Sequence, residues 1–445
     1  MAVKLLYFSC RTVLYLLVFS HIACISSPYK RIARRLHKTI NTSAVFSSHF
    51  TGFALYDPSK QHMVYARQAD KYFTPASNTK LFTLYTSLQI LGDSIPALQY
   101  TLKNDSLIFW GTGDPSFLHP DLKSTKAYQF LCKRADTTLY YVSTYQGRPF
   151  GPGWAWDDYN DYYQPEKSAF PVYGNIVRFA VDSVKQIVPY PSFFSRYLIQ
   201  DSIRPYKADI IQRDLSENLF TYYPNASQLS FTKDIPYKYS PSLLLQLLSD
   251  TLHKNITLLN KPSVTGEVHT LYSLPADTLY KRMMQESDNF LAEQLLLLCA
   301  STKWDTLESE KTIEFARETL LQDLPHKPIW RDGSGLSRYN LFTPASIVKL
   351  LEKMYKQIPQ QRLFSLFPAG GQSGTLKNWY ATATGQPYVY AKTGSLSNVH
   401  CLSGYLLTKK GTVLIFSFMH NNMVRPSSDI RKEMTTILQT LHERY

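Results

Sequence analysis

The sequence predicts an α+β fold in which the two ends of the chain build one antiparallel sheet. Alternating runs typical of a hairpin, together with a helix, occur near both termini. Between them, residues 95–264 have few helical signals and many short strand-like runs rich in Tyr and Pro. We therefore expect a split domain formed by residues 28–94 and 265–445, interrupted by an inserted, mainly β region that could contain two subdomains.

The N-terminal part of the split domain is predicted to contain a helix, a hairpin and a second helix. Residues 30–42 carry helical periodicity, and alternating runs at 51–56 and 62–66 flank a turn that contains proline. An apolar helix is expected over 81–91, because Pro75 just ahead of it is a typical start signal.

The C-terminal part is predicted to contain two further helices, a hairpin and a closing helix. Helical periodicity returns over 276–299 and 344–357, and strands are expected at 399–407 and 411–418. An amphipathic helix is expected over 429–442, because apolar side chains recur there on one stripe. With the terminal helices packed on one face, the two hairpins would form a single antiparallel sheet.

Composition and charge exclude several classes of protein. The 445 residues are 44% hydrophobic and 18% charged, which excludes a wholly disordered chain, and the length suggests two or three domains. The formal net charge of +14 would suit nucleic acid, a membrane surface or an anionic polymer. The sequence has no zinc-finger spacing, RNP-like motif or long basic helix, so no nucleic-acid partner is expected.

The densest basic run lies near the N-terminus and contains Lys30, Arg31, Arg34, Arg35 and Lys38, with no acidic residue between them. Two interpretations are equally compatible with such a run, a solvated helix face and a face attracted to a membrane surface. The sequence alone leaves both open.

Residues 1–25 are predicted to be an export signal. Lys4 and Arg11 precede an apolar run at 12–19 that is too short for a comfortable transmembrane helix, and small residues follow it. Cys24 could be the acylated cysteine of a lipoprotein signal, so we expect a periplasmic or cell-envelope location, with the membrane contacted only through the N-terminus. The other cysteines after it are too widely spread for a disulfide framework or a metal motif: Cys132, Cys299 and Cys401.

Three short motifs contain residues suited to acyl-transfer chemistry. The first, Ser77-x-x-Lys80, puts a hydroxyl and an amine on one face at the start of a helix. Such a lysine can take the hydroxyl proton if burial and nearby positive charge lower its pKa. The motif alone is weak, because a chain of this length contains such a pair by chance.

The second motif, Ser287-Asp288-Asn289, falls within a predicted helix, and the third, Lys392-Thr393-Gly394-Ser395, follows a strand-like run. A strand at the edge of a cleft would there offer a cation for a carboxylate, a hydroxyl, and a glycine where a substrate backbone approaches. In this order, the three motifs match the set found in serine β-lactamases and penicillin-binding proteins.

The chain resembles the class C low-molecular-mass penicillin-binding proteins, the D-Ala-D-Ala carboxypeptidase/endopeptidase family. The resemblance covers nearly all of the chain after the signal and includes these segments: Phe73–Lys80, Gly111–Pro115, Gly153–Asp158, Met284–Glu293, Asp332–Arg338, Ser373–Leu376 and Lys392–Leu396. About 210 residues separate Ser77 from Ser287, which leaves room for the insertion that distinguishes this family from compact β-lactamases. The Tyr-rich insert and Phe290 depart from the family pattern without touching the chemistry. The resemblance implies a penicillin-binding transpeptidase/β-lactamase-like domain, with helices flanking the antiparallel sheet.

The resemblance also implies the roles of four catalytic residues. Ser77 would attack the carbonyl of a D-Ala-D-Ala bond in a peptidoglycan stem peptide, with Lys80 as base. Ser287 would relay the proton to the leaving amine, and Asn289 would hold Lys80 and the peptide backbone. Water would then hydrolyse the acyl-enzyme, β-lactams would acylate the serine and stall, and no metal or cofactor is expected.

Substrate-binding roles are implied for the third motif and for the insert. Lys392 and Thr393 would take the terminal carboxylate beside Gly394, and the N–H groups of Ser77 and Ser395 would form the oxyanion hole. In relatives that recognise diaminopimelate, the positions of three further residues form a side-chain pocket: Asp158 for an ammonium, Arg338 for a carboxylate and Tyr163 for the aliphatic stem. Structural salt bridges in an aromatic insert are an equally open interpretation of these three.

Two other functions remain open at this point. A serine β-lactamase or esterase of the same fold would turn penicillin over rapidly instead of forming a stable adduct. A non-catalytic peptidoglycan-binding or structural envelope protein would not need the motif residues, and their presence argues against it.

Overall fold

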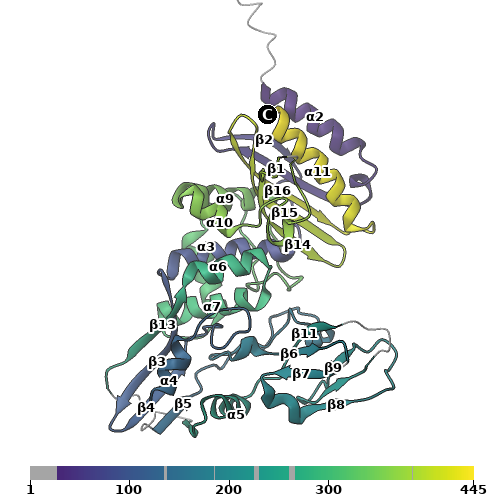
Figure 1. The fold of residues 1–445 in the computed structure, drawn as a ribbon. Coiled ribbons are helices and arrows are strands. Elements are labelled where there is room, and N and C mark those ends of the chain that lie inside the picture. Colours follow the sequence, from purple (N-terminus) through teal and green to yellow (C-terminus); the bar gives the residue numbers. More distant parts are fainter. Residues whose placement is uncertain (1–27, 135–137, 185, 225–229, 260–265, 383) are drawn as a thin grey trace, which may run out of the picture.

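The computed structural model of the chain describes residues 28–134, 138–184, 186–224, 230–259, 266–382 and 384–445. The predicted signal at 1–25, with Cys24, lies outside the described residues. The described chain forms a sheet-and-helix domain from both ends of the sequence, and an inserted region lies beyond the helices of that domain (Figure 1).

The two ends of the chain meet in one five-stranded antiparallel sheet, as the sequence predicts. Strand β1 from the N-terminal part pairs with β16 from the C-terminal part, and Phe53 lies opposite Phe418. Helices α2 (Pro28–Thr42) and α11 (Ser427–Arg444) cover one face of this sheet (Figure 1). The strand order is β14 (Val389–Leu396), β15 (Val399–Leu407), β16 (Val413–Asn421), β1 (Phe50–Asp57) and β2 (His62–Arg67).

A layer of helices covers the other face of the sheet and contains the largest hydrophobic core. Helix α7 (Asn289–Trp304) is buried on every side from Phe290 to Ser301, as expected of an apolar helix inside a core. The other helices of the layer are α3 (Lys80–Ile90), α6 (Ala276–Gln285), α8 (Ser309–Phe315) with a π-helical turn at Ala316–Leu320, α9 (Pro344–Gln357) and α10 (Gln360–Leu366).

The inserted region is mainly β and has two hydrophobic cores, with Tyr239 packed against both. Strands β3 and β13 pair with each other and lead the chain into and out of the region. The first core lies between one five-stranded sheet and two helices, α4 (Lys126–Cys132) and α5 (Pro241–Leu252). The strand order of this sheet is β12 (Ile256–Leu259), β5 (Thr138–Val142), β4 (Ser106–Gly111), β3 (Ser94–Lys103) and β13 (His269–Pro275). The second core lies between two three-stranded sheets. The strand order of one sheet is β11 (Phe231–Pro236), β6 (Ile176–Val181) and β7 (Ile187–Tyr190), and that of the other is β8 (Leu198–Gln200), β10 (Phe220–Tyr222) and β9 (Ile211–Arg213).

The single helix expected over 276–299 is wrong, because the chain breaks it at the second motif. Helix α6 ends at Gln285 and α7 begins at Asn289. Between them, Ser287 adopts a left-handed φ of 59°, and the Asp288 side chain accepts a hydrogen bond from the Leu291 N–H and caps α7. A capping aspartate bonds N–H groups that a continuous helix would have bonded within itself. Because the apolar pattern of the sequence continues across this point, periodicity alone does not reveal the break.

Candidate active site

Ser77 and Lys80 contact each other directly at the start of α3. Ser77 belongs to a short 3-10 turn, η2 (Ala76–Thr79), that runs straight into the helix. Lys80 Nζ donates to Ser77 Oγ over 3.0 Å, and the Lys80 side chain is completely buried. The two groups are therefore within the distance that proton transfer requires.

Two further acceptors hold the Lys80 amine in place. It donates to Asn289 Oδ1 over 2.6 Å and to the backbone oxygen of Ser334 over 2.7 Å. The side-chain amide of Asn289 in turn donates to the backbone oxygen of Tyr163, which belongs to the insert, over 3.1 Å. With Ser77, these acceptors occupy all three N–H donors of an ammonium group and aim the amine at the serine.

Burial lowers the pKa of Lys80 to about 8, and the carboxylates of Asp332, Glu293 and Asp288 oppose this shift. The sequence led us to expect nearby positive charge as a second cause, whereas the neighbouring charges that act on Lys80 are negative. At pH 7 roughly a tenth of the lysine is therefore neutral and able to accept a proton.

A pair of buried carboxyl groups supports the loop that holds Lys80. Glu293 Oε1 accepts a hydrogen bond from the Ser334 N–H over 2.8 Å, and Asp332 accepts from the N–H groups of Gly335 and Ser337 over 2.9 and 2.6 Å. Burial, together with the charge of Asp332, raises the pKa of Glu293 to about 7. Sequence reasoning missed these supporting residues as site residues, although they lie in segments that carry the family resemblance.

Ser287 and Lys392 form the second polar pair of the site. Lys392 Nζ donates to Ser287 Oγ over 2.7 Å and to the backbone oxygen of Thr393 over 2.8 Å. Burial lowers the pKa of Lys392 well below its usual value, and the charge of Lys80 adds to this effect. The sequence predicted a cation on a strand at the cleft edge, and in the structure Lys392 is completely buried and contacts Ser287.

Gly394 allows strand β14 to approach Ser77 closely. A Cβ atom at this position would lie 2.6 Å from the Pro75 oxygen and 3.1 Å from the Ser77 nitrogen. Ala76, directly before Ser77, has a left-handed φ of 48°, a strained conformation of the kind that often occurs at functional sites. The backbone around Ser77 is thus fixed by close packing.

The hydroxyl groups of Thr393 and Ser395 on β14 contact neighbouring side chains. Thr393 Oγ1 donates to Thr375 Oγ1 over 2.9 Å, and Ser395 Oγ is 3.2 Å from Nδ1 of His400 on the neighbouring strand. Thr375 was not predicted as a site residue. Its segment, Ser373–Leu376, resembles the family, and that is the signal that could have found it.

A cavity of about 900 Å³ lies over Ser77 and has the insert as its opposite wall. Asp158, Tyr163 and Arg338, the three residues predicted to contact a substrate side chain, line it together with Ser77. Burial raises the pKa of Asp158, and the charge of Arg338 opposes this shift. The Tyr163 hydroxyl donates to Asp161 over 3.1 Å. The structure therefore brings the predicted pocket residues into the cavity over Ser77.

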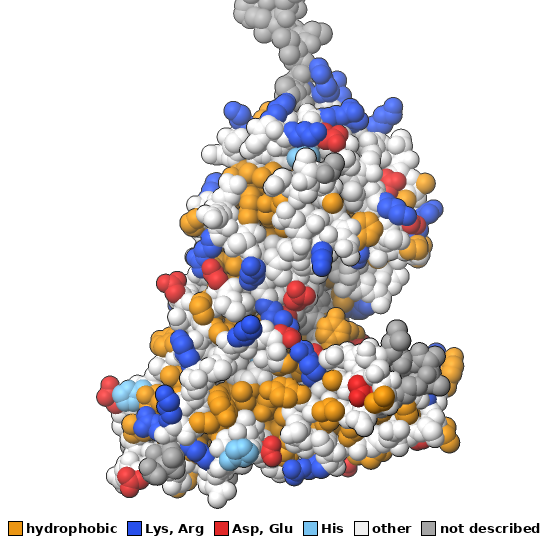
Figure 2. All heavy atoms as spheres, viewed as in Figure 1, with side chains coloured by type: hydrophobic (Ala, Val, Ile, Leu, Met, Phe, Trp, Pro, Cys, Tyr) orange, Lys and Arg blue, Asp and Glu red, His pale blue; other side chains and the backbone are white. Residues whose placement is uncertain are grey.

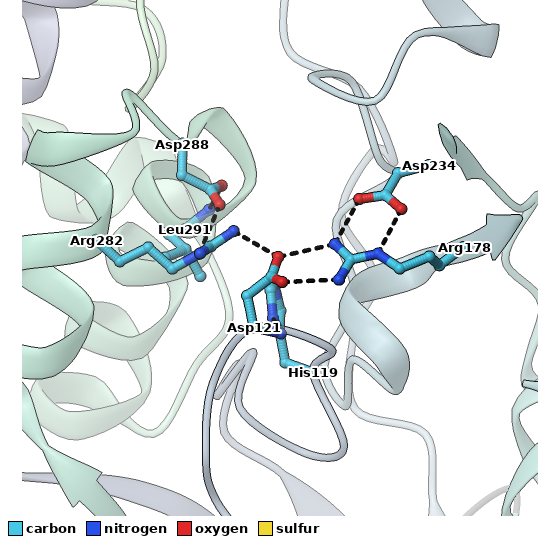
Figure 3. A network of polar contacts seen from close by, with 7 residues as sticks. All are labelled: His119, Asp121, Arg178, Asp234, Arg282, Asp288 and Leu291. Carbon is cyan, nitrogen blue, oxygen red and sulfur yellow. Dashed lines mark hydrogen bonds and ion pairs between the residues drawn. The ribbon is translucent and has the colours of Figure 1, made fainter. Parts of the chain in front are cut away.

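An ionic network joins the insert to the second motif (Figure 3). Asp121 accepts two hydrogen bonds from Arg178 of β6, over 2.7 and 2.8 Å, and one from Arg282 of α6, over 2.8 Å. Arg178 also donates two hydrogen bonds, each of 2.7 Å, to Asp234 of β11. Arg282 lies 3.4 Å from Asp288, the middle residue of the second motif. Sequence reasoning did not find this network.

A sequence model of the D-Ala-D-Ala carboxypeptidase 3 (S13) family matches residues 33–441. The chain belongs to this family. Membership confirms the predicted resemblance and the predicted activity, that of a D-Ala-D-Ala carboxypeptidase.

Two curated relatives and one solved structure of this kind span most of the chain. D-alanyl-D-alanine carboxypeptidase DacB of Haemophilus influenzae is 24% identical over 401 residues, which cover 82% of this chain and 84% of the relative. Penicillin-sensitive carboxypeptidase A of Dictyostelium discoideum is 23% identical over 437 residues, covering 84% and 83%. The crystal structure of penicillin binding protein 4 (dacB) from Haemophilus influenzae has a TM-score of 0.73 at 19% identity, covering 92% of this chain and 99% of the other, which confirms the predicted fold class.

Proposed function

We propose that Ser77 is the nucleophile with which this D-Ala-D-Ala carboxypeptidase forms its acyl-enzyme on peptidoglycan stem peptides, and that endopeptidase cleavage uses the same site. The proposal is carried by the buried Lys80 amine, which lies 3.0 Å from the Ser77 hydroxyl and is held by Asn289. A nucleophile beside a base that a third group orients is the arrangement that covalent catalysis needs.

In the acylation step, the neutral form of Lys80 accepts the proton of Ser77 Oγ while this oxygen attacks the carbonyl carbon of the substrate. The N–H groups of Ser77 and Ser395 stabilise the negative oxygen that forms, and both residues line the cavity. Because the pKa of Lys80 is about 8, its neutral fraction grows as the pH rises from 7 to 9.

In the next step the carbon–nitrogen bond of the tetrahedral intermediate breaks, and the leaving amine takes up a proton. The proton that Lys80 took from Ser77 returns to this amine through Ser287, whose Oγ is oriented by Lys392. Water then attacks the acyl-enzyme with Lys80 again as base, which releases the shortened peptide and restores Ser77.

Capture of the terminal carboxylate is assigned to the edge of β14. The hydroxyls of Thr393 and Thr375, 2.9 Å apart, offer donors there, and Lys392 lies behind them. A bound carboxylate would favour the charged form of Lys392 and raise the pKa that burial lowers. Substrate binding and the charge of this lysine are thereby linked.

The pocket formed by Asp158, Tyr163 and Arg338 is proposed to recognise a zwitterionic side chain such as the free end of diaminopimelate. The carboxylate and the guanidinium lie in one cavity, and the tyrosine ring lies beside them. Opposite charges on the two ends of the side chain would be paired, and its aliphatic stem would lie against the ring.

Export to the cell envelope is part of the proposal, with residues 1–25 as the signal and Cys24 as a candidate for lipid attachment. In the described part of the chain, no helix is both long and apolar enough to cross a bilayer. Mass spectrometry of the mature N-terminus distinguishes lipid attachment at Cys24 from plain cleavage, and an unprocessed chain in the cytosol would contradict both.

Release of D-Ala from a stem pentapeptide tests the proposed function. We expect release by the unaltered chain and none by Ser77→Ala, whereas Ser48→Ala, at an exposed serine outside the cavity, retains the activity. Rapid hydrolysis of penicillin without D-Ala release would instead identify a β-lactamase. Equal release by the unaltered chain and by Ser77→Ala would refute the proposed nucleophile.

A further inference from the structure

One face of helix α2 carries a dense cluster of positive charge, the basic face, made of Lys30, Arg31, Arg34, Arg35 and Lys38. All five side chains are exposed. At about 100° per residue, their positions span an arc of roughly 140° on one side of the helix. The opposite side packs into the core through Ile32, Ala33, Leu36 and Ile40. The helix is therefore fixed to the protein by its apolar side, with its cations facing outward.

Neighbouring groups do not neutralise these cations. Helix α2 contains no acidic residue, and none of the ion pairs found among the described residues includes a member of the basic face. The adjacent helix α11 carries as many acidic as basic residues, so it adds no net charge of its own. Asp57, which contacts Tyr29 at the start of α2, is also bonded by the hydroxyl of Tyr445.

The position of the basic face in the chain indicates what covers it. Helix α2 follows soon after the apolar run at 12–19 and after Cys24. Fully extended, the residues between that run and α2 span only about 30 Å. An N-terminal segment that stays in a membrane or carries a lipid at Cys24 holds the basic face within reach of the bilayer, and a chain released by plain cleavage would depend on the basic face alone. Figure 2 shows Lys and Arg side chains gathered at this end of the molecule, and Figure 1 shows the inserted region at the opposite end.

We propose that the basic face of α2 docks on the surface of an anionic phospholipid bilayer. Each Lys or Arg brought close to an anionic leaflet strengthens binding about fivefold at moderate salt. A chain docked through α2 directs the cavity over Ser77 and the whole insert away from the bilayer. The enzyme would then work at the membrane surface while its substrate-binding side faces the surrounding cell wall.

Co-sedimentation of the full chain with vesicles tests this proposal. Vesicles of phosphatidylcholine containing phosphatidylglycerol measure docking through charge, and pure phosphatidylcholine vesicles measure any binding through residues 1–27. The test variant replaces the five cations of the basic face by Gln, which keeps helix propensity. The control variant makes the same change in charge at exposed lysines elsewhere: Lys103, Lys123, Lys126, Lys133 and Lys281.

We expect the test variant to bind anionic vesicles at least about 100-fold more weakly, and the control variant to stay within a few-fold of the unaltered chain. Binding by the unaltered chain should fall steeply with salt, and penicillin labelling of Ser77 should be the same in all three proteins. An equal loss in the two variants would show that overall charge matters and would overturn the proposal. Binding of the basic face to a soluble anionic polymer but not to vesicles would also overturn the proposal.

Discussion

The two walls of the cavity over Ser77 are built in different ways. The motif wall, formed by the split domain, holds its lysines completely buried and its key contacts between 2.6 and 3.0 Å. The insert wall, formed by the inserted region, presents charged side chains that keep between about a fifth and a third of their surface exposed, such as those of Asp121 and Asp234. Proton transfer needs fixed, desolvated groups, whereas recognition of a charged side chain can take place in partly hydrated surroundings.

This difference predicts which acyl donors a substitution in each wall should affect. Every acyl donor, drug or peptide, must use the motif wall if Ser77 is the nucleophile that we propose. Only a substrate whose side chain reaches across the cavity uses the insert wall. Changes in the motif wall should therefore lower reaction with all donors, and changes in the insert wall should distinguish among them.

The largest effect is expected from Lys80→Met, which removes the base and keeps the length of the side chain. Acylation by penicillin and by peptide should both fall about 10³-fold. In the unaltered enzyme the acylation rate should rise with pH through about 8, because the neutral lysine is the active form. A stopped-flow pH profile measures this, with Lys281→Met at an exposed lysine as the control. A flat profile between pH 6 and 9 would contradict the role of Lys80.

A smaller loss of acylation rate is expected from Gly394→Ala. The added methyl group meets the Pro75 oxygen and the Ser77 nitrogen and must displace either β14 or the nucleophile. A shift of this size costs about 10²-fold in acylation rate. Gly92→Ala, where the added methyl group would contact nothing within 4 Å, should leave the rate unchanged. Equal rates for the two variants would mean that the strand does not need to approach the serine so closely.

Arg338→Ala tests recognition of the substrate side chain, because Arg338 of the split domain lines the same cavity as Asp158 of the insert wall. A charge-assisted hydrogen bond contributes roughly 1.5–3 kcal/mol, so kcat/KM for peptides with a free diaminopimelate end should fall about ten- to a hundredfold. Simple acyl-D-Ala-D-Ala peptides and penicillin labelling should be little affected, and Arg331→Ala, also at an exposed arginine, serves as the control. An equal loss on both kinds of peptide would show that Arg338 supports the fold or the motif wall.

The smallest effect is expected from Asp121→Asn, which weakens the ionic network. We expect the free energy of unfolding to fall by about 1–2 kcal/mol and acylation to change less than tenfold. Asp277→Asn breaks a more exposed pair with Arg362 and should cost less than about 1 kcal/mol. Denaturant unfolding of both variants measures this difference in the free energy of unfolding. A larger loss of stability in Asp277→Asn than in Asp121→Asn would contradict the prediction.

The ionic network should also keep its contribution to the stability of the fold in mild acid. Hydrogen bonds from Arg178 lower the pKa of Asp121 to about 2. Its contribution to stability is therefore fully present above the unfolded pKa near 4 and is lost as the pH falls from about 4 through about 2.

Much of the fold could be predicted because its signals are local. The terminal hairpins, α2, α3 and α11 follow from alternation, apolar periodicity and start signals within short windows. The break at Ser287 could not be predicted in the same way, because Asp288 caps α7 inside an unbroken apolar pattern. Capping is a matter of backbone geometry at one residue, and apolar periodicity does not report it.

The sequence singled out the motif residues that the structure brings together around Ser77, but not the residues that support them. The reason is sequence distance: Lys80 contacts Ser334 across 254 positions, and Asp121 contacts Arg282 across 161. Pairings over such distances leave no periodic pattern. The expected cause of the Lys80 pKa was partly wrong for the same reason, because Asp332 and Glu293 come from remote segments.

The central claim, that Ser77 is the residue acylated on the motif wall, is tested most directly by mapping a penicillin adduct. The enzyme is incubated with penicillin, digested and analysed by mass spectrometry, beside the Ser77→Ala variant. We predict one adduct, on the peptide containing Ser77, and none in the variant, whose thermal unfolding should be unchanged. A stable adduct at Ser287 or at any other residue, or labelling of the variant at the unaltered rate, would contradict the account.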